Sequence, residues 1–143
     1  MGAVKHVAAI MATMCTLSAL AAGNASASEI PSGAYDVVST NSNSIMDRWV
    51  ITPNCPELTV GCEADVQSSW VGGQAFYQGH DTWALALKGV VPICPDKSKA
   101  NGAMLFQWKA STLEGQLTNM QRGPCQLTRP GQSQIPFKLV RAS

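Results

Sequence analysis

The stretch from Gly102 to Thr118 alternates apolar and polar residues with a period of two, which is the pattern of a half-buried strand. If the chain is extended here, one face carries the large apolar residues of two successive arms, namely Met104, Phe106, Trp108, Leu113 and Leu117. A helix would hold Gly115 in its interior at a cost of about 1 kcal/mol. The pattern therefore favours a β-hairpin, and a helix across residues 106–113 is the alternative.

Shorter runs of the same kind occur along the chain, with turn signals at a spacing of roughly ten residues. The Gly72-Gly73 pair is expected to take positive φ and to form a tight reversal between two of these strands. A tract rich in Gly, Pro and Gln, residues 119–134, separates the hairpin from the last strand. About eight short strands predict a small all-β, antiparallel barrel or sandwich, and we favour the barrel. Outside the hairpin, the predicted strands cover residues 33–40, 47–52, 66–71, 74–77, 82–88 and 135–140.

The first residues have the pattern of an export signal. Lys5 and His6 precede an apolar run over residues 7–22, and the small residues at 25–27 resemble a cleavage site. The apolar run is shorter than the about 20 residues that a membrane-spanning helix needs. We expect a helical signal peptide, residues 1–27, to be removed, which leaves one secreted domain over residues 28–143 and no stable membrane span. An uncleaved anchor is the alternative.

The charge balance is neutral once the leader is removed. Loss of Lys5 leaves nine basic residues against nine acidic ones. Nucleic acid and anionic membrane surfaces favour a basic patch, and this balance indicates neither as a partner. The basic side chains fall in turn-like stretches, where we expect them to be solvated, as for Lys97, Lys99, Arg122 and Arg129.

Five cysteines become four without Cys15, and an even number in a small exported chain predicts disulfides. Three pairings are possible. We favour Cys55 with Cys62, which brackets a short loop, and Cys94 with Cys125, which brackets the hairpin. The spacings lack the paired C-x-x-C of most zinc ribbons, so no metal site is predicted.

The order of these features resembles a group of small secreted mycobacterial proteins and the extracellular sensor-like regions of some mycobacterial membrane serine/threonine kinases. The resemblance spans most of residues 33–139 and implies an exported, disulfide-bonded fold whose biochemical role is largely undefined. It carries over no catalytic residue. The motifs that support it are Gly33-x-Tyr35 with Val37-x-Ser39, Trp49-x-x-Thr52-Pro53, the cysteine loop, Trp83-x-Leu85, Cys94-Pro95-Asp96, and Trp108 with Thr112-Leu113-x-Gly115.

Catalytic groups are sparse in the predicted mature chain. His80 is its only histidine and lies beside Asp81, so it is the one candidate for acid–base chemistry near neutral pH. Ser68 and Ser69 lack the G-x-S-x-G context of a nucleophile elbow. The carboxylates are dispersed, and we expect most of them in turns or on solvent faces. We therefore predict no enzyme and no cofactor, with a small hydrolase that uses His80 or a carboxylate pair as the alternative.

The aromatic residues suggest a core and one exposed rim. Trp49, Trp83 and Trp108 lie in the middle of predicted strands, where we expect them to be buried. Trp70 lies at a strand end, and Phe76 and Tyr77 lie across the predicted turn from it. These three residues are the candidate partner-binding rim.

These observations predict a secreted, monomeric β-domain of unknown biochemical activity that binds a partner without catalysing a reaction. An envelope or extracellular protein, a glycan or a lipid is the expected partner. The other alternative is a carrier of apolar ligands, which needs a cavity of about 300 Å³ or more. A barrel filled by Trp49, Trp83, Phe106 and Trp108 would leave no room for such a ligand.

Overall fold

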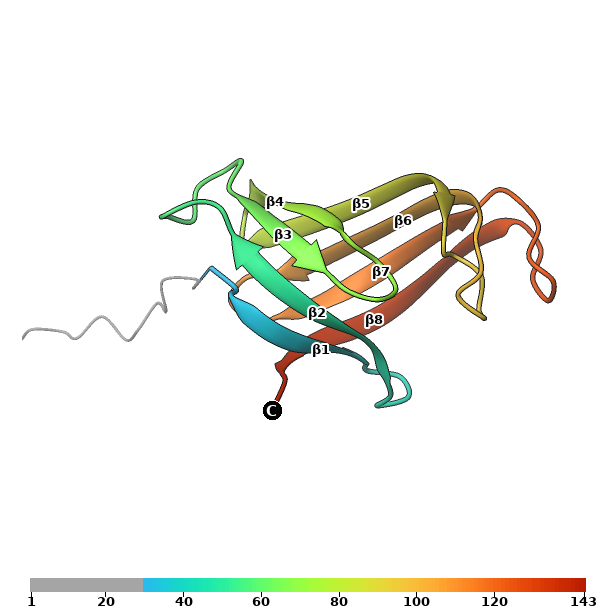
Figure 1. Ribbon diagram of the computed structural model, residues 1–143, viewed down its shortest axis with the longest axis horizontal. Coiled ribbons are helices and arrows are strands. Elements are labelled where there is room, and N and C mark those ends of the chain that lie inside the picture. Colours follow the sequence, from blue (N-terminus) through green and yellow to red (C-terminus); the bar gives the residue numbers. More distant parts are fainter. Residues whose placement is uncertain (1–29) are drawn as a thin grey trace, which may run out of the picture.

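The computed structural model describes Ile30–Ser143, and these residues form a closed barrel of eight antiparallel strands (Figure 1). The predicted signal peptide, residues 1–27, lies outside the described residues. Each strand pairs with the next, and the last pairs with the first. The strands are β1 (Gly33–Ser39), β2 (Ile45–Pro53), β3 (Glu63–Gln67), β4 (Gly73–Gly79), β5 (Thr82–Val91), β6 (Ala100–Lys109), β7 (Glu114–Gln121) and β8 (Gly131–Arg141).

The predicted all-β, antiparallel fold is confirmed. Of its two predicted forms, barrel and sandwich, the structure is a barrel. Pairing of β1 with β8, from Tyr35 with Arg141 to Ser39 with Phe137, closes the sheet. Closure removes the free edges that an open sheet would expose to other chains. The alternative of a helix across residues 106–113 is wrong, because β6 continues to Lys109 and a turn follows.

The predicted hairpin is formed by β6 and β7, in which Phe106 pairs with Leu117 and Trp108 with Gly115. Gly115 is required because β7 lies close to both β6 and β8 here. A Cβ atom at Gly115 would lie 2.2 Å from the Gln107 carbonyl oxygen and 2.7 Å from the Phe137 ring. The four apolar residues that point inward are at most 1% exposed: Met104, Phe106, Trp108 and Leu117.

Aromatic rings fill one half of the barrel interior. Trp49 packs edge-on against Phe106, with ring centroids 5.1 Å apart, and against Trp108 at 5.6 Å. Trp83 stacks on Trp108 with an interplanar angle of 10°. Tyr77 lies against Trp83 at 5.6 Å, and its hydroxyl oxygen accepts a hydrogen bond from the Asp81 backbone N–H. The predicted burial of the mid-strand tryptophans is confirmed, since Trp49, Trp83 and Trp108 are at most 1% exposed.

Successive connections alternate between the two ends of the barrel. Connections 54–62, 80–81 and 110–113 lie at the end that the aromatic rings fill, which we call the filled end. Connections 40–44, 68–72, 92–99 and 122–130 lie at the other end, which we call the pocket end. In Figure 1 the strands β5 to β8 reach well toward the loops of the pocket end.

Both predicted disulfides are confirmed. Cys55 bonds Cys62 within the β2–β3 connection, at the filled end. Cys94 bonds Cys125 and so joins the β5–β6 connection to the β7–β8 connection, at the pocket end. Each pair has Cα atoms 5.6 Å apart. The second disulfide therefore clamps the two loops that flank the β6–β7 hairpin.

Two local predictions are wrong. The Gly72-Gly73 pair is not a tight reversal with positive φ, because Gly73 already pairs with Val66 in the sheet and the turn spans residues 68–72. The Ser68 hydroxyl holds this turn by accepting the N–H groups of Trp70 and Val71 at 3.1 and 2.8 Å. The tract 119–134 is also more regular than its composition suggests, since β7 runs to Gln121 and β8 begins at Gly131.

Candidate ligand-binding pocket

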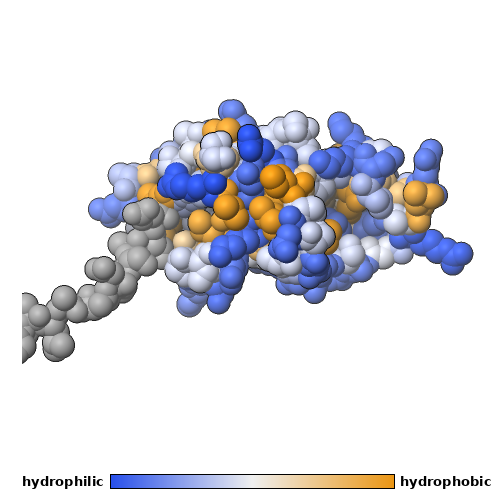
Figure 2. All heavy atoms as spheres, turned by 90° about the horizontal axis from the view of Figure 1, so that it is seen from below, coloured by the Kyte–Doolittle hydropathy of each residue, from blue (hydrophilic) through white to orange (hydrophobic). Residues whose placement is uncertain are grey.

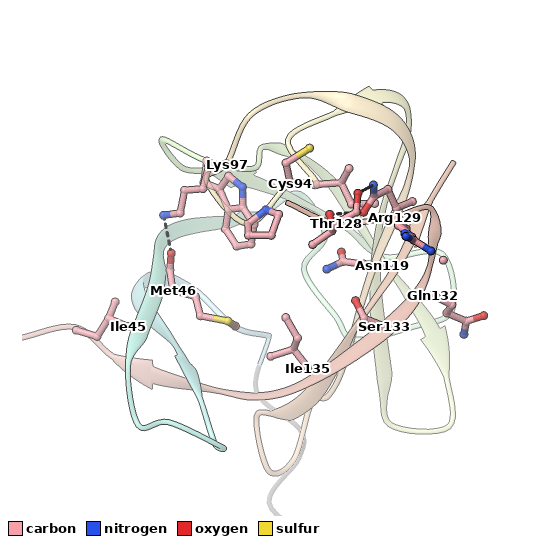
Figure 3. Close-up of a pocket in the computed structure, with 15 residues that line it drawn as sticks. Ile45, Met46, Cys94, Lys97, Asn119, Thr128, Arg129, Gln132, Ser133 and Ile135 are labelled. Carbon is pink, nitrogen blue, oxygen red and sulfur yellow. Dashed lines mark hydrogen bonds between the residues drawn. The ribbon is translucent and has the colours of Figure 1, made fainter. Parts of the chain in front are cut away.

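A pocket of about 530 Å³ lies inside the pocket end of the barrel (Figure 3). This volume falls within the about 300–1,000 Å³ of typical small-molecule sites. Its walls come from β2, β7 and β8 and from the connections that carry Trp70, Lys97 and Arg129. The two neighbouring strands that bound it on one side are long, with eight residues in β7 and 11 in β8, whereas β3 has five. The long strands extend the barrel wall beyond the aromatic core.

The floor and one side of the pocket are apolar. Met46, Trp70 and Ile135 are half-buried and pack against the aromatic core, and buried Ile93 joins them in the lining. Trp70 is fixed in place, because its indole Nε1 donates a hydrogen bond to the Pro92 carbonyl at 3.0 Å. Its ring meets Phe106 edge-on at 6.2 Å. This surface can bind an apolar group without exposing it to water.

The opposite side is polar because the inward positions of β7 and β8 change character along each strand. On β7 the inward sequence runs from Leu117 through Asn119 to Gln121, and on β8 it runs from Phe137 through Ile135 to Ser133. Asn119 and Ser133 are cross-strand partners in the pocket wall. Apolar side chains thus face the core, and polar side chains face the mouth.

The side-chain amides of Gln121 and Asn119 in this wall differ in their hydrogen bonds. The Gln121 amide donates to the carbonyls of Gly123 and Thr128 at 2.9 and 3.2 Å, and its Oε1 accepts the Thr128 hydroxyl at 2.9 Å. These bonds hold the β7–β8 connection. Asn119 instead has a solvent-shielded Oδ1 with no hydrogen-bond partner. In Figure 3 its side chain projects into the middle of the pocket.

Two cationic side chains lie at the mouth, and no acidic residue of the described chain lines the pocket. The Lys97 ammonium donates to the Met46 carbonyl at 3.0 Å and lies 5.1 Å from the centre of the Trp70 ring (Figure 3). Arg129 lines the mouth on the Asn119 side. Asp96, next to Lys97, is outside the lining, and hydrogen bonds from the Ser98 hydroxyl and backbone N–H lower its pKa.

The three residues of the predicted rim do not form one surface. Trp70 lies in the 68–72 connection and lines the pocket. Phe76 and Tyr77 follow each other on β4 and so point to opposite faces, with Phe76 outside and Tyr77 packed on Trp83 at the filled end. Phe76 is 44% exposed. Of this set, Trp70 alone contributes to the pocket.

His80 is exposed in the two-residue connection between β4 and β5, where its φ of 50° and the 60° of Asp81 form the turn. Ser68 and Ser69 lie in the connection at the other end of β4. The structure therefore does not bring His80 together with either serine. The Asp81 carboxylate accepts hydrogen bonds from the backbone N–H and hydroxyl of Ser111, which ties the β4–β5 turn to the β6–β7 turn.

One carboxylate is in an unexpected place. Asp47 is 6% exposed and points into the barrel, whereas turns and solvent faces were expected for most acidic residues. Its oxygens accept the Trp49 indole N–H and the Arg48 backbone N–H, both at 2.8 Å. A buried carboxylate needs such donors, so Asp47 orients the central tryptophan. On the outer face, the Asp36 carboxylate pairs with the Arg48 guanidinium at 2.8 Å.

The outer surface is mixed in character. On the face seen from below in Figure 2, apolar residues gather in the middle and hydrophilic residues lie around them. Ile45, 62% exposed, lies at the pocket mouth, and Leu127, 90% exposed, lies in the β7–β8 connection. Between Ile30 and Ser143 no helix is long and apolar enough to cross a membrane. Within the same range, His, Cys, Asp and Glu side chains form no group of three that could hold a metal ion.

Sequence reasoning missed Asn119, Ser133 and Arg129 as pocket residues. The signal was present in the two-residue period, because Asn119 continues the inward positions after Leu117, and Ser133 precedes Ile135 by two. Polar residues at inward positions look like the end of a strand unless the wall they form encloses a cavity. The role of Arg129 has no sequence signal, since it depends on how the disulfide and Gln121 place its loop.

In comparisons with protein-family models, with curated proteins and with solved structures, no match to this chain is found. The resemblance to secreted mycobacterial proteins and kinase sensor regions stays a prediction. The function must therefore be argued from the pocket itself.

Proposed function

We propose that this protein is a secreted, non-enzymatic binding protein that holds one small amphiphilic molecule at the pocket end of its barrel. The observation that carries the proposal is the pocket of about 530 Å³ with an apolar floor and a polar mouth. Of the partner classes that the sequence suggests, a lipid-like molecule suits this lining best. The two disulfides are compatible with an extracellular location.

The barrel holds both an aromatic core and a cavity, which were expected to exclude each other. The four rings of Trp49, Trp83, Phe106 and Trp108 fill the barrel toward the filled end, so no ligand lies there. The pocket lies beyond them and exceeds the about 300 Å³ that a small ligand needs. The filled half serves as a rigid base for the site.

The structure also supplies preorganisation, which lowers the entropic cost of binding. Trp70 is held by its bond to Pro92, and the loop that carries Lys97 is held by its bond to Met46. The Cys94–Cys125 disulfide joins the two loops on either side of the mouth. A ligand that enters the pocket therefore meets walls that are already in place.

The test is calorimetric titration of the purified domain with decanol, a neutral amphiphile, below its solubility limit. We expect saturable binding at one site. Ile135→Trp places an indole in the pocket and should weaken binding by tenfold or more, on the order of 1.4 kcal/mol. The control is Val140→Trp on the outer face of the same strand, where Val140 is 44% exposed and outside the pocket. The absence of decanol binding, or equal effects of the two substitutions, would contradict the proposal.

A further inference from the structure

We propose that the ligand is a single-chain carboxylate, similar to a fatty acid, whose headgroup lies between Arg129 and Asn119 while its chain occupies the apolar floor. This inference rests on the proposed function and adds the chemical class of the ligand.

The Arg129 guanidinium is available to bind an anion. Among residues 30–143 it forms no ion pair, whereas the Arg48 guanidinium is paired with Asp36. The Lys97 ammonium is already engaged by the Met46 carbonyl and the Trp70 ring. A guanidinium presents a planar fork of N–H donors that matches the two oxygens of a carboxylate. The described lining holds no acidic residue that would compete with a ligand anion for Arg129.

Asn119 adds a donor at intermediate depth. Its Oδ1 is shielded and unpartnered, so the Nδ2 amino group is the part of the amide that remains to meet a ligand. Amino N–H groups donate to carboxylate oxygens. In Figure 3 Asn119 and Arg129 lie on the same side of the pocket, opposite Met46 and Lys97. We therefore place the headgroup between these two donors.

The change from apolar residues at the pocket floor to charged residues at its mouth sets the direction of the ligand's alkyl chain. The half-buried residues Met46, Trp70 and Ile135 pack on the core, and the exposed residues Lys97 and Arg129 stand at the mouth. An apolar tail therefore points toward the Phe106 ring, and the headgroup faces outward. Each methylene of the ligand that leaves water adds to the affinity.

The headgroup should carry a single charge. Lys97 and Arg129 both lack an ion pair in the described chain, but they lie on opposite sides of the mouth, so a headgroup beside Asn119 meets the arginine charge alone. The single negative charge of a carboxylate balances that charge, whereas a phosphate monoester carries roughly −1.5 to −2 at neutral pH. A carboxylate is also planar, as is the guanidinium that faces it. These two properties favour a carboxylate over a phosphate.

The experiment compares four probes with the same ten-carbon chain on the intact domain at neutral pH: decanoate, decanol, decyl phosphate and decyltrimethylammonium. We expect decanoate to bind about tenfold or more tightly than decanol, in line with a charge-assisted hydrogen bond. Arg129→Gln should weaken decanoate binding by about tenfold, and should weaken decanol binding much less, because decanol carries no charge. Arg122→Gln is the matched control, because Arg122 is an exposed arginine in the same connection that does not line the pocket.

The outcomes separate this inference from the function on which it rests. Equal binding of decanoate and decanol, or equal effects of the two arginine substitutions, would overturn the carboxylate assignment while the pocket remained a binding site. Tighter binding of decyl phosphate or of decyltrimethylammonium would overturn it as well. If no probe binds, the proposed function itself fails.

Discussion

The two ends of the barrel are built from the same eight strands but fill their inward positions differently. Toward the filled end these positions carry Trp49, Trp83, Phe106 and Trp108, which pack ring against ring. Toward the pocket end β7 and β8 present shorter or polar side chains such as Asn119 and Ser133, and a cavity remains. The alternating pattern of the strands is thus enough to form the barrel. The size and polarity of the inward residues then decide which end is a rigid scaffold and which end can bind a ligand.

The largest effect should come from removing a ring of the filled half. Phe106→Ala should lower the free energy of unfolding by about 4 kcal/mol, because Phe106 is fully buried and its loss leaves a cavity. Ile135→Ala removes a half-buried residue at the pocket and should cost about 1 kcal/mol. Urea unfolding followed by circular dichroism measures both values. Equal losses would remove the distinction between the two ends.

The next effect separates the two disulfides. Replacing Cys94 and Cys125 with alanine opens the longer loop and should cost about 3.7 kcal/mol in the chain-entropy account, against about 2.5 kcal/mol for Cys55 and Cys62. Affinity for decanol should fall in the first variant alone, because that disulfide joins the two loops at the pocket mouth. Unfolding and calorimetric titration of both variants check this. A loss of affinity in the Cys55 and Cys62 variant would contradict the assignment of the site to one end.

The third effect tests how tightly the strands pack in the filled half. Gly115→Ala places a Cβ atom against the Gln107 carbonyl and the Phe137 ring and should cost about 3 kcal/mol. Gly131→Ala is the matched control at the pocket end, because nothing lies within 4 Å of a Cβ atom there. We expect the control to be neutral or more stable by up to about 1 kcal/mol. Similar unfolding midpoints for both variants would show that the close approach at Gly115 is wrong.

The smallest effect has the opposite sign. Asn119→Leu removes a shielded carbonyl oxygen that has no partner and should raise the free energy of unfolding by about 1 kcal/mol. The same change removes the Nδ2 donor and should weaken decanoate binding more than decanol binding. A gain in stability with a loss of selectivity is the expected signature of a site residue. A variant that is less stable would show that Asn119 serves the fold.

The fold was largely predictable because period-two alternation reports which side chains face the core. It placed Met104, Phe106, Trp108 and Leu117 inside, and the cysteine spacing identified both disulfides. Leu113, predicted on the same face, instead lies half-buried in the β6–β7 turn. Alternation fails where inward positions are polar, so the beginning of β8 at Gly131 was missed. Burial of Asp47 also escaped prediction, since its partner is the indole of Trp49 two residues away.

The site was less predictable than the fold. Trp70, a candidate from its place at a strand end, lines the pocket. Its predicted grouping with Phe76 and Tyr77 does not match the strand geometry, since neighbouring residues on β4 face opposite sides. The pocket depends on the overhang of long strands and on the position of two clamped loops, which are properties of the closed barrel. Local sequence does not encode them.

The most direct test of the account uses the indole N–H signals of the four tryptophans in a nuclear magnetic resonance titration with decanoate. Trp70 lines the pocket, whereas the indole N–H groups of Trp83 and Trp108 are buried in the filled half. We predict a large, saturable shift of the Trp70 signal with little change for Trp83 and Trp108. Shifts centred on Trp83 and Trp108, or a Trp70 signal that does not move, would contradict a ligand site at the pocket end.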